Sequence, residues 1–275
     1  MSENINNKNI EYLILKNKKI LVAEDVKLNQ DLVKRILQTH NVDVTIVENG
    51  VEVLKQIEQN YFDCVLMDVH MPEMDGIEAT KRIRQLADKN KSSTPIIALT
   101  AELPEAGEEK FFDAGMNSCL AKPYDEFNLL NTIVKYLQKD TMKTSVLATE
   151  NIVNIDNAPI AEDKLYDLAM VKSVSGGDKE FIKKMIALFI ETVPKDVKQL
   201  QASSSSQNWI QVGKIAHKLK STIDSMAIKT IQKDIRTIET NAKEQSCVEI
   251  LPPLIEKVNE VINACVEQLQ LELAE

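Results

Sequence analysis

The stretch Ile20-Leu21-Val22-Ala23-Glu24-Asp25 decides the fold of the first half of the chain. Its apolar run has the length of a buried strand, and two carboxylates follow directly. Four further runs of this kind occur at Val44–Val47, Cys64–Met67, Pro95–Leu99 and Ser118–Ala121. Helical apolar spacing lies between them, and a last helix is expected over 125–137. Apolar strands separated by helices predict a five-stranded, doubly wound parallel α/β sheet covered on both faces.

The second half has only helical patterns. Four amphipathic helices with short connections predict an all-α four-helix bundle. Between the halves the periodicity fades into a polar stretch, which indicates a linker. The expected divisions are an N-terminal lead at 1–17, the α/β domain at 18–139, the linker at 140–163 and the bundle at 164–275.

Composition narrows the functional classes. A chain of 275 residues fits two domains, and a net charge of −9 argues against nucleic acid as a partner. The four cysteines are scattered without metal-ligand spacing, so reduced thiols are expected. The polar start and the absence of long apolar runs favour a cytoplasmic protein without direct membrane insertion.

Charged and hydroxyl side chains follow several predicted strands. Glu24 and Asp25 follow the first, Asp68 the third, Thr100 the fourth and Lys122 the fifth. The carboxyl ends of parallel strands share one edge of a sheet, so these groups should meet there. Crowded carboxylates need a compensating cation, and an oxygen-rich acidic site suits Mg²⁺. Such a group can stabilise a phosphoryl group passing to a carboxylate.

Over 19–137 the sequence resembles the response-regulator receiver family, whose domains have a flavodoxin-like fold. The matching segments are Ile20–Asp25, Asp68-Val-His-Met-Pro-Glu-Met-Asp-Gly76, Ile97–Ala101 and Ala121-Lys122-Pro123. The resemblance implies that Asp68 is the phosphoacceptor and Asp25 a direct ligand of Mg²⁺, or of Mn²⁺ in its place. It further implies that Glu24 holds the metal through water and that the His70 backbone carbonyl completes the ligands. Thr100 and Lys122 would contact the phosphoryl oxygens.

Two positions bear on this resemblance. The family usually has an aromatic residue where Cys119 stands, which puts its usual output surface in doubt. His70 stands where phosphatases of the haloacid-dehalogenase type need a second Asp, which argues against that class. Its side chain matches a variable position of the receiver family, so no role is expected for it.

A histidine is the candidate group of the bundle. His217 follows Ala216 on an amphipathic helix and should face solvent beside Lys214, Lys218 and Ser221. A lone helical histidine is commonly an inert surface residue, and the residues alone leave this interpretation open. Ala216-His217-Lys218-Leu219-Lys220-Ser221 resembles the signature of histidine-phosphotransfer (HPt) domains. That resemblance implies that His217 is phosphorylated and that Lys220 helps to neutralise the phosphoryl group.

Together the halves predict a phosphorelay protein that exchanges phosphate between Asp68 and His217. Its expected partners are an upstream sensor histidine kinase and a downstream response-regulator receiver. No ATP-binding kinase core is recognisable, and the chain has only seven glycines. Two alternatives stay open, namely a non-catalytic phosphorylation-dependent binding module and the tail of a hybrid sensor kinase.

Overall fold

A computed structural model describes residues 12–101, 110–138 and 164–274. The first part contains five strands and the helices that connect them. The strands are β1 Lys19–Ala23, β2 Asp43–Val47, β3 Cys64–Asp68, β4 Ile96–Thr100 and β5 Ser118–Ala121. The helices are the 3₁₀ turn η1 Tyr12–Leu15, α2 Lys27–Thr39, α3 Gly50–Gln59, α4 Gly76–Arg84, α5 Lys89–Ser92, α6 Lys110–Asp113 and α7 Glu126–Leu137.

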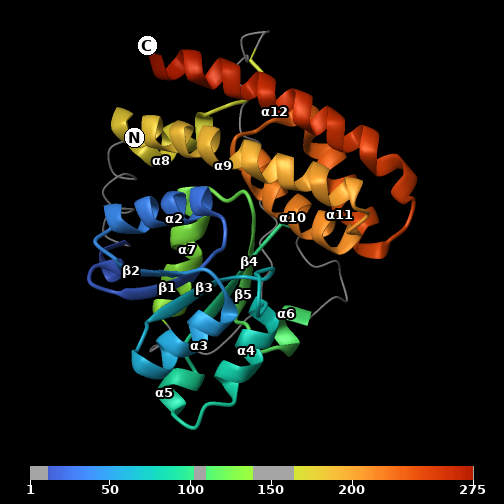
Figure 1. Ribbon diagram of the computed structural model, residues 1–275. Coiled ribbons are helices and arrows are strands. Elements are labelled where there is room, and N and C mark those ends of the chain that lie inside the picture. The colour runs from blue at the N-terminus through green and yellow to red at the C-terminus, as the bar shows by residue number, and fades with distance from the viewer. Residues whose placement is uncertain (1–11, 102–109, 139–163, 275) are drawn as a thin grey trace.

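All five strands are parallel, in the order β2-β1-β3-β4-β5. Side chains alternate along each strand, so each face of the sheet buries its own apolar set. Ile20, Val22 and Leu66 pack with α2 and α7, whereas Leu21 and Val65 pack with α3 and α4. Figure 1 shows these two helical layers on opposite faces. The predicted doubly wound, flavodoxin-like sheet is confirmed.

Capping residues begin the helices that follow the strands. The side chains of Asn49, Asp75 and Asp125 each accept a hydrogen bond from the backbone three residues onward, at the starts of α3, α4 and α7. Such bonds satisfy amide groups that have no partner within the helix. The chain therefore turns back sharply at the strand ends and leaves this edge of the sheet open for functional side chains.

The second part is helical throughout its described residues. Its helices are α8 Ala169–Ser175, α9 Lys179–Ser205, α10 Trp209–Ser225, α11 Gln232–Glu244 and α12 Leu251–Ala274, with 3₁₀ turns η2 Lys229–Ile231 and η3 Val248–Ile250. The four long helices contact one another in the cycle α9, α10, α11, α12. This is the predicted bundle, with the short α8 as an unpredicted addition. Gly176 and Gly177 adopt positive φ angles between α8 and α9, where a side chain would strain the turn.

The bundle lies against the sheet domain through α2, which contacts α8, α9 and α10. Figure 1 shows α2 directly beneath α8 and α9. Arg35 donates to the backbone carbonyl of Ser175 at 3.1 Å and pairs with Asp178 at 3.2 Å. Lys184 pairs with Asp31 at 3.0 Å. One apolar cluster runs from α2 and α7 into the bundle core, so the two domains bury surface together.

Two segments flank the predicted α/β domain, the N-terminal lead and the linker. The proposed linker at 140–163 lies outside the described residues. Within the predicted lead at 1–17, Leu15 is fully buried and the Tyr12 hydroxyl donates to Asn131 at 3.0 Å. This turn therefore packs on the α/β domain.

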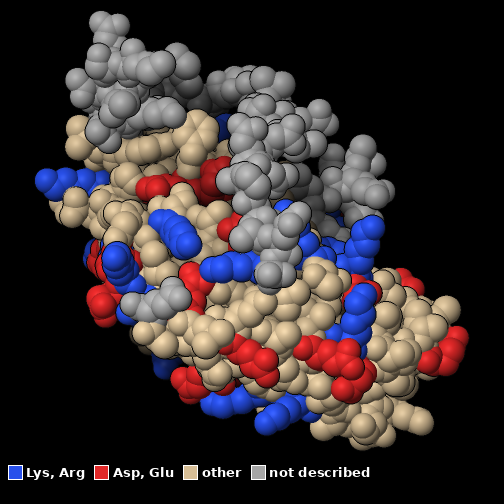
Figure 2. Space-filling view, turned by 90° about the horizontal axis from the view of Figure 1, so that it is seen from above, with Lys and Arg blue, Asp and Glu red and all other residues tan. Residues whose placement is uncertain are grey.

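The described surface carries charges of both signs. On the face drawn in Figure 2, basic and acidic side chains are interspersed, with apolar and neutral surface between them. Among the residues that the structure describes, no helix is long and apolar enough to cross a membrane.

Candidate functional site

The strand register brings the predicted site residues to one edge of the sheet. Ala23 lies opposite Met67, and Thr100 lies opposite Ala121. Glu24, Asp25 and Lys122 follow these strand ends directly, while Asp68 is the last residue of β3. The parallel sheet thus collects, from four separate segments, groups that the sequence could place only at strand ends.

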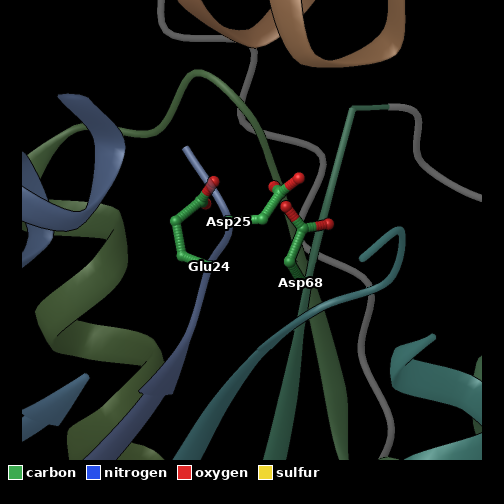
Figure 3. Close-up of side chains that lie close together, drawn as sticks. All are labelled: Glu24, Asp25 and Asp68. Carbon is green, nitrogen blue, oxygen red and sulfur yellow. The ribbon is translucent and has the colours of Figure 1, made fainter. Parts of the chain in front are cut away.

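Glu24, Asp25 and Asp68 form a carboxylate cluster. One oxygen from each lies within 4.8 Å of the others, and Figure 3 shows the three side chains pointing toward the same space. The Lys122 ammonium lies 2.5 Å from carboxylate oxygens of both Glu24 and Asp68. All three paired side chains are at most 8% exposed. Lys122 therefore compensates part of the negative charge of the cluster.

Burial and like charge raise the pKa of the carboxyl groups that Lys122 does not fully compensate. Burial, followed by repulsion from Glu24 and Asp68, raises the pKa of Asp25 to about 7. Burial also raises the pKa of Glu24, although Lys122 opposes the effect. For Lys122 itself burial alone would lower the pKa, but Asp68 and Glu24 outweigh it and raise the pKa above its ordinary value.

The donor set fits a hard divalent cation. Three carboxylates offer oxygen ligands within one small space, which suits Mg²⁺ and leaves room for water or phosphate oxygens. Burial first, and then repulsion from Glu24 and Asp68, make the ionised form of Asp25 unfavourable in the metal-free chain. A divalent ion would supply compensating positive charge, so the residues present fit the predicted metal site.

A tight loop after β3 shapes the rim of the cluster. The His70 backbone N–H donates to the Asp68 carboxylate at 3.0 Å, and the Gly76 N–H donates to the carbonyl of Val69. A Cβ atom at Gly76 would lie 2.2 Å from the backbone oxygen of Asp68. Only glycine allows this approach, which explains the Gly in the Asp75-Gly76 pair that begins α4.

His217 is less exposed than its helical position predicts. Its side chain is only 13% exposed, and Ser221 on the same expected face is buried. The cause is tertiary, because α11 packs on α10 and the α/β domain covers this end of the bundle. Lys214 remains exposed, while Lys218 pairs with Asp196 at 3.0 Å. The expectation of a solvent-facing histidine is therefore wrong.

Glu239 on α11 organises the groups around His217. It lies 2.6 Å from His217 Nδ1, 2.5 Å from the Lys220 ammonium and 2.6 Å from the Lys243 ammonium. Burial alone would raise the pKa of this carboxyl group, but His217 and the two lysines lower it below its ordinary range. Glu239 is therefore ionised at neutral pH and acts as a hydrogen-bond acceptor.

This contact determines which ring nitrogen of His217 carries the proton. An ionised carboxylate can only accept hydrogen bonds, so Nδ1 must carry the proton that it donates to Glu239. In the neutral imidazole the lone pair then lies on Nε2. The network therefore selects the tautomer whose lone pair lies on Nε2.

A residue bonded to Asp68 contacts His217 across the domain boundary. The His70 ring contacts the His217 ring edge to face, with 4.7 Å between centroids and an interplanar angle of 74°. His70 is also the residue whose backbone donates to Asp68. In Figure 3 a helix of the bundle, in pale orange, lies on the side toward which the three carboxylates point. The contact gives the His70 side chain a place in the site that the sequence did not suggest.

Sequence reasoning missed three groups: Glu239, Lys243 and the His70 side chain. The spacing of Glu239 and Lys243 signals an i,i+4 ion pair on a helix, but not its meeting with His217. Of the predicted groups, Lys220 is buried against Glu239 and Thr100 is buried at the end of β4. Cys119 is partly buried in an apolar cluster that also contains Phe111.

Two family models match the chain. Residues 20–134 match the response regulator receiver domain, and residues 184–272 match the Hpt domain. The chain therefore contains a receiver domain followed by an Hpt domain, the order found in the C-terminal part of hybrid kinases. Both resemblances drawn from the sequence are confirmed.

Curated relatives agree with this assignment. The chain is 24% identical over 249 residues to the signal transduction histidine-protein kinase BarA of Escherichia coli, covering 90% of this chain and 26% of BarA. It is 33% identical over 145 residues to hybrid signal transduction histidine kinase I of Dictyostelium discoideum, covering 50% of this chain and 8% of that protein. The chain thus spans about a quarter or less of these relatives.

One solved structure is the receiver domain of a sensor histidine kinase from Pseudomonas aeruginosa, which has a magnesium ion coordinated in its active site cleft. It is 35% identical, covers 44% of this chain and 98% of its own, and gives a TM-score of 0.41.

Proposed function

We propose that this chain is a phosphorelay intermediate in which Asp68 of the receiver and His217 of the Hpt domain exchange a phosphoryl group. The observation that carries the proposal is the contact of the His217 ring with His70, whose backbone N–H is bonded to Asp68. The domain order supports the same role, and it disfavours a module that only binds other proteins.

In this proposal the chain's own residues position and neutralise the phosphoryl group. Lys122, buried between Glu24 and Asp68, is placed to contact a phosphoryl oxygen on Asp68. Thr100, at the end of β4, is the proposed hydroxyl contact. Glu24, Asp25, Asp68 and the His70 backbone carbonyl would hold Mg²⁺ or Mn²⁺, which supplies positive charge for the phosphoryl oxygens. Phosphoryl transfer needs mainly such positioning and charge stabilisation.

On the bundle side, Glu239 holds the Nδ1 proton of His217 and leaves Nε2 as the nucleophile. Lys220 and Lys243 balance the charge of Glu239. Both lysines share the Glu239 carboxylate with His217, and Lys220 is the proposed cation that helps to neutralise a phosphoryl group on His217. The partners are proposed by chemistry, as a phosphohistidine donor on a sensor kinase and an aspartate acceptor on a further receiver. Four free cysteines accord with the proposed location in the reducing cytoplasm.

A labelling experiment tests the proposal. The full chain is incubated with labelled acetyl phosphate and Mg²⁺, and the label is mapped by mass spectrometry. Acid and base stability distinguish the two products, because aspartyl phosphate is labile in base and phosphohistidine is labile in acid. Label on Asp68 followed by label on His217 is expected. Label on Asp68 that never reaches His217 would contradict the relay.

The metal site makes a prediction about pH. Mg²⁺ needs ionised carboxylates, and the pKa of Asp25 in the metal-free protein is about 7. Stabilisation of the fold by Mg²⁺ should therefore be small near pH 6 and grow as the pH rises through 7. At a hundredfold excess over Kd, we expect about 2–3 kcal/mol in thermal or chemical unfolding.

The sign follows from proton binding. Since the native pKa of Asp25 is raised above its ordinary value of 3.8, the metal-free fold loses stability as the pH rises from about 4 to 7. Asp25→Asn should remove both this loss and the response to Mg²⁺. Asp43→Asn, an exposed carboxylate at the opposite end of a strand, is the matched control. A response to Mg²⁺ that is equal at pH 6 and pH 8 would contradict the site.

The docking of the two domains makes a second prediction. Lys184 of α9 pairs with Asp31 of α2, so Lys184→Glu places like charges together. Transfer from Asp68 to His217 should slow by a few fold, the effect of one ion pair whose lysine is exposed to solvent. Adding Asp31→Lys should restore the rate, measured by rapid quench. Lys183→Glu, the same change at an exposed neighbour, should have no effect. Equal rates in the unmodified chain and all three variants would show that this interface is not used.

A further inference from the structure

His70 touches both of the proposed phosphoacceptors. Its backbone N–H donates to the Asp68 carboxylate at 3.0 Å, and its ring packs edge to face on His217 with centroids 4.7 Å apart. His70 lies in the loop after β3 and is exposed as a residue, yet its ring contacts the His217 ring at the junction of the two domains. One residue of the receiver therefore links the two acceptors directly.

The His217 ring needs more than one contact to hold its plane. The hydrogen bond from Nδ1 to Glu239 anchors one atom, but it leaves the ring free to rock about that point. A second contact on the ring removes this freedom. The His70 ring, at 74° to that of His217, provides such a contact from the opposite domain. Reacting groups must lie in near-attack geometry, and displacement by about 1 Å can cost on the order of a hundredfold in rate.

We propose that His70 is a positioning residue, whose ring holds the His217 imidazole so that Nε2 is aligned with the phosphoryl group on Asp68. This inference rests on the proposed relay between Asp68 and His217. In the step itself the P–O bond to Asp68 breaks, and its electron pair stays on the carboxylate. The lone pair of Nε2 forms the P–N bond, while the proton on Nδ1 remains shared with Glu239. His70 makes and breaks no bond.

A single-turnover experiment on the full chain tests this role. Asp68 is loaded with labelled acetyl phosphate and Mg²⁺, and the appearance of phosphohistidine is followed by rapid quench. The transfer rate is expressed per phosphorylated Asp68, so a change in the extent of Asp68 phosphorylation does not alter the measured rate. His70→Ala is expected to slow transfer about tenfold, the upper range for loss of an aromatic contact.

Matched variants separate positioning from other effects. His70→Phe keeps a ring of similar size and should retain most of the rate, since the proposed role needs no proton. His70→Leu keeps a side chain of similar bulk but has no aromatic edge, so it should transfer as slowly as His70→Ala. If His70→Ala does not fold, His70→Leu serves as the test in its place. His40→Ala, at a histidine paired with Glu126 elsewhere on the receiver, should transfer at the normal rate.

The outcomes distinguish this inference from the function on which it rests. Normal transfer in the Ala and Leu variants, or loss in the Phe variant equal to theirs, would overturn the positioning role alone. An unmodified chain that loads Asp68 but forms no phosphohistidine would instead overturn the relay. Slow transfer in Ala and Leu with recovery in Phe supports the proposal.

Discussion

Replacing Asp68 with asparagine is expected to abolish phosphohistidine formation on His217 from acetyl phosphate and Mg²⁺. Asparagine cannot form the acyl phosphate, and the proposed route to His217 passes through that group. The converse variant, His217→Gln, should accumulate phosphate on Asp68, because the acceptor Nε2 is gone. Both results are read from label that is distinguished by its stability in acid and base.

Mixing the two variants tests whether transfer occurs within one chain. In the docked structure His217 lies beside the receiver of its own chain, so transfer should be first order and independent of protein concentration. A mixture of Asp68→Asn and His217→Gln chains can transfer only between molecules, and its rate should rise with concentration. If Asp68→Asn chains still acquired phosphohistidine at the unmodified rate, the two sites would not form a relay.

Replacing Glu239 with alanine is expected to destabilise the fold by about 3 kcal/mol. The Lys220 side chain is only 4% exposed, and its ammonium would lose its carboxylate partner inside the bundle. Removing one member of a buried ion pair is costly because the other charge stays desolvated. Glu239→Gln retains an acceptor oxygen and should cost less. Glu260→Ala, an exposed glutamate on α12, should change stability by less than about 0.5 kcal/mol.

The effect of Glu239→Gln on stability has a predictable pH dependence. Since the pKa of Glu239 is lowered in the fold, its stabilising contribution is fully present above the ordinary value of 4.5 and is lost as the pH falls below it. The stability difference between the unmodified chain and Glu239→Gln should therefore be larger at pH 7 than at pH 4 in chemical denaturation. A difference that is constant across this range would show that the carboxylate is not ionised against its three partners.

Glu239→Gln should also separate stability from chemistry. A neutral amide no longer holds the Nδ1 proton by charge, so both tautomers of His217 become accessible. We expect transfer from Asp68 to His217 to slow although the bundle remains folded. Nitrogen NMR of the His217 ring in the full chain should show the change in tautomer.

The receiver site could be predicted closely from sequence because parallel sheets obey simple rules. An apolar run followed by Glu24 and Asp25, and another followed by Asp68, place carboxylates at strand ends. In a parallel sheet those ends share one edge. The sequence thus pointed to the cluster that the structure contains, although its metal and its chemistry remain proposals. The bundle was predicted equally well, since helical periodicity is a local signal.

The surroundings of His217 could not be predicted in this way. Its position next to Ala216 predicted that His217 faces solvent. Apolar periodicity shows only which face of a helix packs on the core of its own domain, and it says nothing of contacts with other elements. Glu239, which lies on the next helix, and the His70 ring, which belongs to the other domain, reduce its exposure to 13%. Neither contact has a sequence signal, because no period links residues on separate elements.

The sequence by itself therefore determined the two folds and the residues at the sheet edge, through local apolar patterns and strand-end positions. The tertiary structure decided how these parts act together. The packing of α11 on α10 gave His217 its Nδ1 partner, and the packing of the bundle on α2 brought its ring against His70. Both arise from surfaces that lie far apart in the sequence and meet only in the tertiary structure, as the Lys184–Asp31 pair between the domains illustrates.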